Sequence, residues 1–445
     1  MFEKEERKLE EGRREYEKVE IPRDIDDYIR SGIRKGKKRT GLPSWRVGMV
    51  AASILLVIFF TTIKVSPVFA NYVSTIPGME RIVELIRNNK GILSAVENDY
   101  LQEVGITREE NGISLTIDAI IVDEMQMLVF YTLEADRDWS SLRLGNISLN
   151  AESGERLEQY GVGFGSHEGI KKGEKVSGEL QFTSPDEKSI PENFILKTGL
   201  KVNEALIVDD LLFPIKVDSE KFSAIKKDIY IAKTIEVGSQ FIYFEKIEIH
   251  PTRIALFMDF PESNTHEIFR FDDIALEDEK GNRWIHDGAH INEENKKVLY
   301  FHSNYFSEPE KLDIVFSSFT ALPKEELEVL IDLDSERFLK VPGDKRFKKV
   351  WVEKDMGDMN GLYVQVQIDE EDHDYFFSIF NGSITDAEGT VFEYNTQSYG
   401  VADDSGLALY EQGLVMDTKK MVSPIRLKIA DYPSRMREHV RLNVK

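Results

Sequence analysis

Very few residues of this chain combine the types and the spacing that catalysis or metal binding requires. The sequence has no cysteine and only eight histidines. Without cysteine, a disulfide scaffold, a thiolate zinc site, an iron–sulfur cluster and a cysteine nucleophile are all excluded. His286 and His290 lie four residues apart, which on a helix would offer two imidazole ligands on one face. Gly288 and an adjacent hairpin predict a loop here instead, so we expect no metal site.

Three further motifs resemble binding or catalytic signatures, but each lacks an essential part. Residues 161–165 are rich in glycine, yet neither a lysine nor a helix follows them as in a phosphate-binding loop. Ser166 and His167 are sequence neighbours, whereas the members of a catalytic triad meet through the fold. Residues 278–282 (DEKGN) resemble part of a calcium loop without its alternating ligands, and we interpret them as a hairpin turn. We therefore predict no catalytic, cofactor-binding or metal-binding residue, no cofactor and no enzymatic activity.

The segment that decides the class of protein is a hydrophobic stretch at residues 47–64. It begins VGMVAASILLVIFFTTI, which is 17 positions without a charge. At ~1.5 Å per residue this run is about 25 Å long, the short end of what crosses a bilayer. Trp45 and Arg46 precede it and Lys64 ends it, as is typical of membrane interfaces. A buried core helix and a signal peptide cleaved after Ala70 are the competing interpretations.

The distribution of charge predicts the orientation of this transmembrane helix. Seven lysines and arginines and no acid lie in residues 30–46, and the more basic side of a span stays in the cytoplasm. The N-terminus is therefore expected inside the cell and the C-terminal region outside the cell membrane. The whole chain carries a formal charge of −23, so nucleic acid is not an expected partner. The expected partners are the lipid bilayer, a cytoplasmic protein bound by residues 1–46 and an unknown extracellular ligand.

Beyond about residue 108 the hydrophobic pattern has the period of two that is typical of β-strands. Paired strand-like runs recur three times, and each pair precedes a hairpin whose turn glycine supplies a positive φ. These glycines are Gly154, Gly281 and Gly389. Residues 215–222 (IKVDSEKF) and 331–338 (IDLDSERF) resemble one another, which predicts equivalent ends for the first two of three tandem units.

The predicted fold is mainly β, with an N-terminal cytoplasmic helix, one transmembrane helix, a short helical collar and tandem immunoglobulin-like antiparallel β-sandwiches. One large β-domain is the alternative. The predicted boundaries are 1–46 for the basic and amphipathic tail, 47–64 for the transmembrane helix, 65–107 for the collar, and 108–222, 229–338 and 344–445 for the three sandwiches, the last two of them immunoglobulin-like.

The tail IPRDIDDYIRSGIRKGKK at 21–38 and the stretch SPVFANYVSTIPGMERIVELIRNNKGILSAVENDY at 66–100 resemble a known family. It comprises uncharacterised single-pass membrane proteins of Gram-positive bacteria that carry an SPxFA juxtamembrane motif and an immunoglobulin-like C-terminal domain. Such proteins are often encoded beside extracytoplasmic-function sigma factors and are described as anti-sigma-factor-like. The resemblance implies that residues 1–46 hold a sigma factor and that the exterior senses envelope conditions. The tail is shorter than the usual anti-sigma domain and lacks its His/Cys zinc signature.

We therefore expect a membrane-anchored envelope sensor or regulator that acts by protein–protein interaction. The first alternative is a surface-displayed binding or structural protein whose tail serves only as an anchor. The second is an envelope hydrolase, for which no residue in the sequence is singled out.

Overall fold

The computed structural model describes residues 79–157, 160–165, 169–183, 190–203, 205–291, 296–356, 359–369, 372, 377–404, 407–416 and 421–445. All of them belong to one compact part of the chain, Pro67–Lys445, within which we distinguish three β units. The predicted cytoplasmic tail at 1–46, the hydrophobic stretch at 47–64 and residues 65–78 of the predicted collar segment lie outside the described residues. Within the described ranges, no helix has the length and apolar character needed to cross a membrane.

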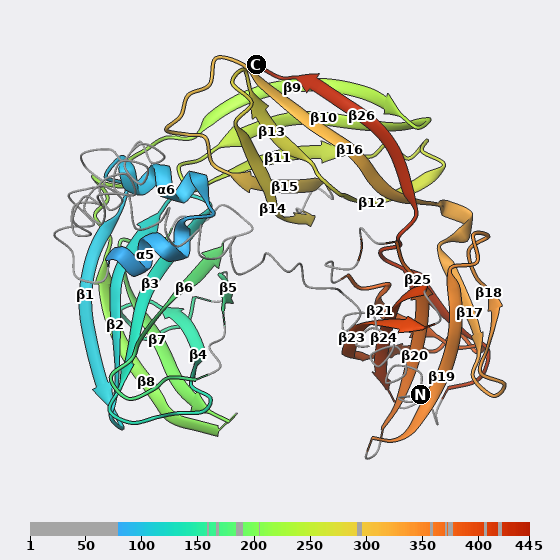
Figure 1. The fold of residues 1–445 in the computed structure, drawn as a ribbon, viewed down its shortest axis with the longest axis horizontal. Coiled ribbons are helices and arrows are strands. Elements are labelled where there is room, and N and C mark those ends of the chain that lie inside the picture. The colour runs from blue at the N-terminus through green and yellow to red at the C-terminus, as the bar shows by residue number, and fades with distance from the viewer. Residues whose placement is uncertain are drawn as a thin grey trace, which may run out of the picture. The chain divides into compact units, whose positions relative to one another are not determined.

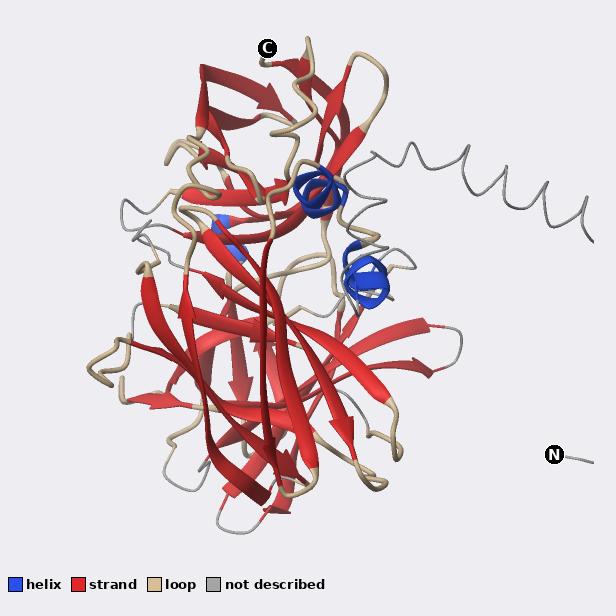
Figure 2. Cartoon of the chain, turned by 90° about the vertical axis from the view of Figure 1, so that its left-hand side faces the viewer, coloured by secondary structure: helices blue, strands red, loops and turns tan. Residues whose placement is uncertain are grey.

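The described chain is mainly β, and all of its strand pairs are antiparallel (Figure 2). Its α-helices are α5 (Met79–Ile86) and α6 (Lys90–Glu97), which we call the collar (Figure 1). The side chain of Asn89 caps α6 by accepting hydrogen bonds from the N–H groups of Gly91 and Ile92, both at 3.1 Å. Both helices lie within the predicted helical collar at 65–107. Gly91 lies in the first turn of α6, because Asn89 starts a new helix there.

The first unit is a β-sandwich of two sheets around one hydrophobic core. Alternate side chains of β2, such as Ile113, Leu115 and Ile117, point into this core, as the period of two predicts. The larger sheet runs in the order β1 (Gln102–Glu110), β2 (Ile113–Val122), β3 (Gln126–Ala135), β6 (Lys175–Thr183), β5 (Gly161–Phe164). The smaller sheet runs in the order β4 (Arg143–Asn150), β7 (Asn193–Val202), β8 (Ala205–Lys216).

The second unit surrounds a separate core with nine strands. Eight of them follow the order β12 (His266–Phe271), β16 (Leu312–Pro323), β13 (Ala275–Asp278), β14 (Arg283–Ile291), β15 (Lys297–His302), β11 (Arg253–Asp259), β10 (Gln240–Ile249), β9 (Lys227–Val237). The ninth, β26 (Arg435–Asn443), pairs with the other side of β16.

The third unit encloses a third core between two sheets. One sheet has the order β18 (Arg337–Lys340), β17 (Glu328–Asp332), β25 (Ile425–Ile429), β21 (Phe380–Thr385), β22 (Val391–Glu393). The other has the order β19 (Phe347–Met356), β20 (Met359–Gln367), β24 (Leu407–Met416), β23 (Asn395–Asp404). A single 3-10 turn, η1 (Lys324–Glu326), connects β16 to β17.

The second and third units are not tandem, which corrects the predicted boundaries 229–338 and 344–445. Strands β17 and β18 belong to the third unit, because β17 pairs with β25. Strand β26 returns to the second unit, so the third unit is an insertion between the paired strands β16 and β26. The similarity of 215–222 to 331–338 misled the prediction because Ile331 packs in the third core, not the second. A short local match does not determine which sheet a strand joins.

The three hairpin glycines do adopt the backbone geometry that the sequence predicts. Their φ values are +89° at Gly154, +78° at Gly281 and +84° at Gly389, a region in which only glycine is unstrained. In the last two turns an aspartate three residues earlier, Asp278 or Asp386, accepts hydrogen bonds from the backbone of the turn. The DEKGN segment is therefore a hairpin turn, as predicted, and the carboxylate of Asp278 accepts hydrogen bonds within it.

Candidate functional site

The histidines that could have bound a metal lie on a strand, which corrects the predicted loop. Strand β14 accommodates Gly288, with φ of +97°, in a β-bulge between His286 and Ala289. The Nδ1 atom of His290 lies 2.8 Å from the hydroxyl of Tyr300, and the two rings stack. Burial lowers the pKa of both His286 and His290. No cluster of three or more potential metal ligands occurs among the residues that the structure describes.

The glycine-rich motif lies on a strand. Residues 161–164 form β5, at the edge of the larger sheet of the first unit, where it pairs with β6. Ser166 and His167 lie outside the described residues. The polar and charged side chains that the structure does bring together lie where the collar and the β units contact one another.

The collar covers the outer face of the larger sheet of the first unit. On β3, Leu128 and Phe130 point away from the sandwich core, yet they are 3% and 0% exposed. Helix α5 packs on β6, with Ile82 and Ile86 almost fully buried. The collar is thus part of the folded β region and adds a third layer to the first sandwich.

Two carboxyl groups lie on this same covered face. Asp118, at a bulge of β2, accepts a hydrogen bond of 2.8 Å from the hydroxyl of Thr132. Glu179 on β6 lies directly across from the fully buried Phe130. Burial raises the pKa of Asp118 to about 6, against the opposing effects of Thr132 and Arg81. Burial also raises the pKa of Glu179 to about 7, and the charge of Asp287 adds to that shift.

Two hairpin turns join the first unit to the second. The turn between β2 and β3 carries Asp123, and the turn between β10 and β11 carries Thr252; both are buried. One oxygen of Asp123 caps its own turn by accepting from the N–H groups of Met125 and Gln126. Its other oxygen accepts from the N–H of Thr252 at 2.8 Å and from its hydroxyl at 2.5 Å. A single carboxylate therefore ties the two turn tips together.

The collar also contacts the second unit at this place. A Cβ atom at Gly91 would lie 2.3 Å from the backbone nitrogen of Ser303, so only glycine permits the close approach. Just after α6, the ring of Tyr100 meets Phe222 edge-on at 5.0 Å and lies 5.7 Å from Phe306. We call the contacts among the collar, the two turn tips and residues 303–306 the collar junction.

A buried glutamate supports the second unit's side of the collar junction. Glu248, with a side chain 1% exposed, lies 2.5 Å from the ammonium of Lys246 and 3.1 Å from that of Lys226. Its carboxylate is also 3.6 Å from Nε2 of His250, next to the turn that carries Thr252. Burial alone would raise the pKa of Glu248, but the hydrogen bond from Lys246 and the nearby side chains of His250 and Lys226 outweigh it and lower the pKa to about 2. The carboxylate is therefore ionised throughout the physiological range.

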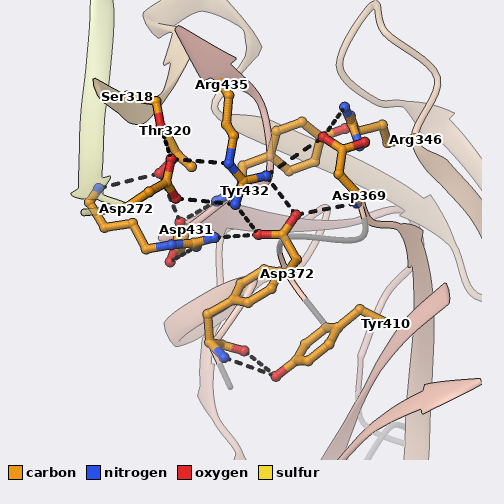
Figure 3. A network of polar contacts seen from close by, with 12 residues as sticks. Asp272, Ser318, Thr320, Arg346, Asp369, Asp372, Tyr410, Asp431, Tyr432 and Arg435 are labelled. Atoms are coloured by element: carbon orange, nitrogen blue, oxygen red, sulfur yellow. Dashed lines mark hydrogen bonds and ion pairs between the residues drawn. The ribbon is translucent and has the colours of Figure 1, made fainter. Parts of the chain in front are cut away.

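A second cluster of charged side chains, the ionic network, joins the second unit to the third (Figure 3). The second unit contributes Arg270, Asp272 and Arg435, and the third unit contributes Arg346, Asp369 and Asp372. Asp431 lies in the segment between β25 and β26, which leads from the third unit back to the second.

Arg435 is the centre of the ionic network. Its Nε and Nη2 atoms donate to both oxygens of Asp272 at 3.0 and 3.1 Å, and Nη1 donates to Asp372 at 2.8 Å. The side chains of Arg435 and Asp372 are 2% and 0% exposed. The hydrogen bonds with Asp372 contribute most to raising the pKa of Arg435. Arg270 bridges Asp372 and Asp431 at 2.7 and 2.5 Å, so the guanidinium groups neutralise carboxylates of both units.

A surface hollow of about 390 Å³ adjoins the ionic network, and its lining includes Ser317, Ser318 and His439. Ser317 and Ser318 donate their hydroxyls to Asp273 and Asp272. The arrangement can hold the second and third units in one relative orientation. Sequence reasoning missed both this network and the collar junction, because central contacts in each join residues that are more than 60 positions apart.

Comparison with known proteins gives two matches to protein families. Residues 43–135 match the model of a family described as Domain of unknown function (DUF4179), and residues 226–343 match one described as Family of unknown function (DUF5643). These matches fit the resemblance to uncharacterised proteins noted from the sequence. No curated protein matches the chain. Among solved structures, the crystal structure of the conserved domain protein from Bacillus anthracis is similar at 14% identity and a TM-score of 0.35, covering 72% of this chain and 92% of that one.

Proposed function

We propose that the chain is a single-pass membrane protein that acts as an envelope sensor or regulator of anti-sigma-factor-like type. In this proposal residues 1–46 bind a sigma factor or another transcription regulator in the cytoplasm, residues 47–64 cross the membrane, and three immunoglobulin-like sandwiches lie outside. The protein acts by protein–protein interaction and not by catalysis.

The observation that carries the proposal is the position of the collar. Its helices begin 15 residues after the hydrophobic stretch, and they pack on the first unit and touch the second. A conformational change at the collar junction would therefore be transmitted to the segment that is proposed to enter the bilayer. The family match at 43–135 supports this, since it covers the hydrophobic stretch and the collar together with β1, β2 and β3.

The predicted topology is tested with single cysteines, because the natural chain has none. Ser31→Cys places one thiol in the tail, and Ser153→Cys places one at an exposed turn of the first unit. In intact cells, a membrane-impermeant maleimide should label Ser153→Cys alone, and both variants after lysis. Labelling of Ser31→Cys in intact cells, or protection of Ser153→Cys, would reject the proposed orientation.

The regulatory role is tested by crosslinking the full-length chain in cells and identifying the proteins recovered with it. We expect a sigma factor or another transcription regulator, and its loss when residues 2–29 are deleted. Equal recovery with and without residues 2–29 would favour the alternative, a surface-displayed binding or structural protein whose tail is only an anchor.

A further inference from the structure

A hollow of about 310 Å³ lies in the second unit next to the collar junction. Its lining includes Asn304 and Tyr305, which belong to the segment 303–306 of that junction. Asn304 is 2% exposed, yet neither its amide nitrogen nor its amide oxygen has a hydrogen-bond partner within the described chain. Leaving a buried amide without partners is costly, because water satisfies both atoms in the unfolded chain. Asn304 therefore offers a donor and an acceptor to a molecule that enters the hollow.

Charged side chains of both signs line the same hollow. Lys227 donates to the carboxylate of Glu308 at 2.6 Å, so these two charges already neutralise one another. Lys445 donates to the carbonyl of Pro309 at 2.6 Å. Neither Lys445 nor the exposed Glu310 has an ion pair among the residues that the structure describes. The hollow thus presents one cation and one anion to a bound molecule.

Apolar side chains complete the wall of the hollow. They include Ile229 of β9 and Ile249 of β10, which face the same space as the amide of Asn304. An apolar wall with a few placed polar groups is typical of small-molecule sites, whose volumes begin at about 300 Å³. The size and the lining therefore fit a small ligand that has an apolar part, a hydrogen-bonding part and charges of both signs.

We propose that this hollow binds a short zwitterionic peptide, a dipeptide or tripeptide with free ends. Its carboxylate pairs with Lys445 and its ammonium with Glu310, while a peptide group exchanges hydrogen bonds with the amide of Asn304. A neutral sugar would leave both charges without partners. A nucleotide would bring further negative charge beside Glu308 and Glu310.

The wall of the hollow is continuous with the collar junction. Ser303 closely approaches Gly91 of α6, and the ring of Tyr305 meets that of Phe306 edge-on at 5.0 Å. A peptide that binds best to one arrangement of this segment stabilises that arrangement, and with it the docked collar. That the peptide acts as a signal rests on the proposed function, whereas binding itself is a property of the second unit.

The test of binding is saturation-transfer NMR of the dipeptide leucyl-leucine with the full-length chain in lipid nanodiscs, with empty nanodiscs as the background. We expect saturation of the leucine methyl groups, because these groups meet the apolar wall. N-acetyl-leucyl-leucine amide keeps the peptide group but lacks both charged ends, so it should bind about tenfold or more weakly. N-acetylglucosamine should give no saturation transfer.

Two variants separate a ligand-binding role of the lining from a structural one. Asn304→Leu removes both polar atoms at similar size, so it should abolish binding while the thermal midpoint stays equal or rises. Glu310→Gln, at an exposed position, should weaken binding of leucyl-leucine about tenfold. Glu236→Gln is the matched control, since Glu236 is exposed on β9 outside the hollow, and it should bind like the natural chain.

No saturation transfer to leucyl-leucine, equal binding of the blocked dipeptide, or a lowered thermal midpoint with retained binding in Asn304→Leu would overturn the proposal. The link to the collar is measured by hydrogen–deuterium exchange, which saturating leucyl-leucine should slow about twofold or more in α6. Binding with unchanged exchange would reject that link. Because these readouts do not involve residues 1–46, they leave the recovery of a cytoplasmic partner as a separate test of the proposed function.

Discussion

The carboxylate of Asp123 and the side chain of Thr252 meet across 129 residues of sequence, and both are buried. The hydroxyl and the backbone N–H of Thr252 both donate to the same carboxylate oxygen. This contact fixes the first and second units at their turn tips. Together with the collar it makes a region in which several elements of the fold contact one another.

Replacing Asp123 should weaken this contact by the energy of two hydrogen bonds to a charged group. Asp123→Ala is expected to lower the free energy of unfolding by about 1–3 kcal/mol, because it also leaves buried N–H groups unpaired. In a double-mutant cycle with Thr252→Val, the coupling energy should be about 1–2 kcal/mol, measured by urea unfolding. Thr234→Val, at an exposed position of β9, is the control and should change stability little. A coupling energy near zero would contradict the assigned contact.

Replacing Gly91 should push the collar away from the second unit. In Gly91→Ala the new Cβ would lie 2.3 Å from the backbone nitrogen of Ser303, so one of the two backbones must move. Overpacking of this kind destabilises by about 1–3 kcal/mol. Faster amide exchange in α6 is the expected readout. Gly165→Ala is the control, because a Cβ there meets no atom within 4 Å; an equal effect of the two substitutions would contradict the close approach.

Removing the central guanidinium of the ionic network should lower the stability of the folded protein far more than removing an exposed guanidinium. Arg435→Ala leaves Asp372 buried without its partner, which typically destabilises by about 3–5 kcal/mol. Arg435→Lys should recover only a small part of the stability that Arg435→Ala loses, since a single ammonium cannot form the two paired hydrogen bonds. Arg441→Ala removes an exposed ion pair from the same strand and should change the thermal midpoint little. Similar losses for Arg435→Ala and Arg441→Ala would show that the network does not hold the units together.

Acid should destabilise the second unit through Glu248. Its pKa is lowered to about 2 in the folded protein, so the stability that it contributes is present above an unfolded pKa near 4.5 and is lost as the pH falls toward 2. Glu248→Gln should be less stable than the natural chain at neutral pH and should lose less stability on acidification. Urea unfolding of the two proteins between about pH 2 and 7 measures both differences. Parallel curves for the two proteins would exclude this role of Glu248.

Local structure could be predicted from the sequence more fully than the contacts between distant segments. The period of two predicted the paired strands, and Gly154, Gly281 and Gly389 predicted the hairpin turns, because both depend on neighbouring residues. Asp123 and Thr252 lie in separate turns, and nothing in the sequence indicated that these turns meet. The return of β26 to β16 escaped prediction for the same reason. Gly288 was taken for a loop signal, although a β-bulge uses the same backbone freedom.

The central claim is that the exterior is coupled through the collar to a cytoplasmic partner. Its most direct test is the amount of sigma factor or other regulator crosslinked in cells to Gly91→Ala, compared with the natural chain and with Gly165→Ala at equal expression. The account predicts a changed recovery for Gly91→Ala alone, although the substitution lies outside the proposed membrane span. Unchanged recovery in a variant whose collar exchanges faster would contradict the coupling.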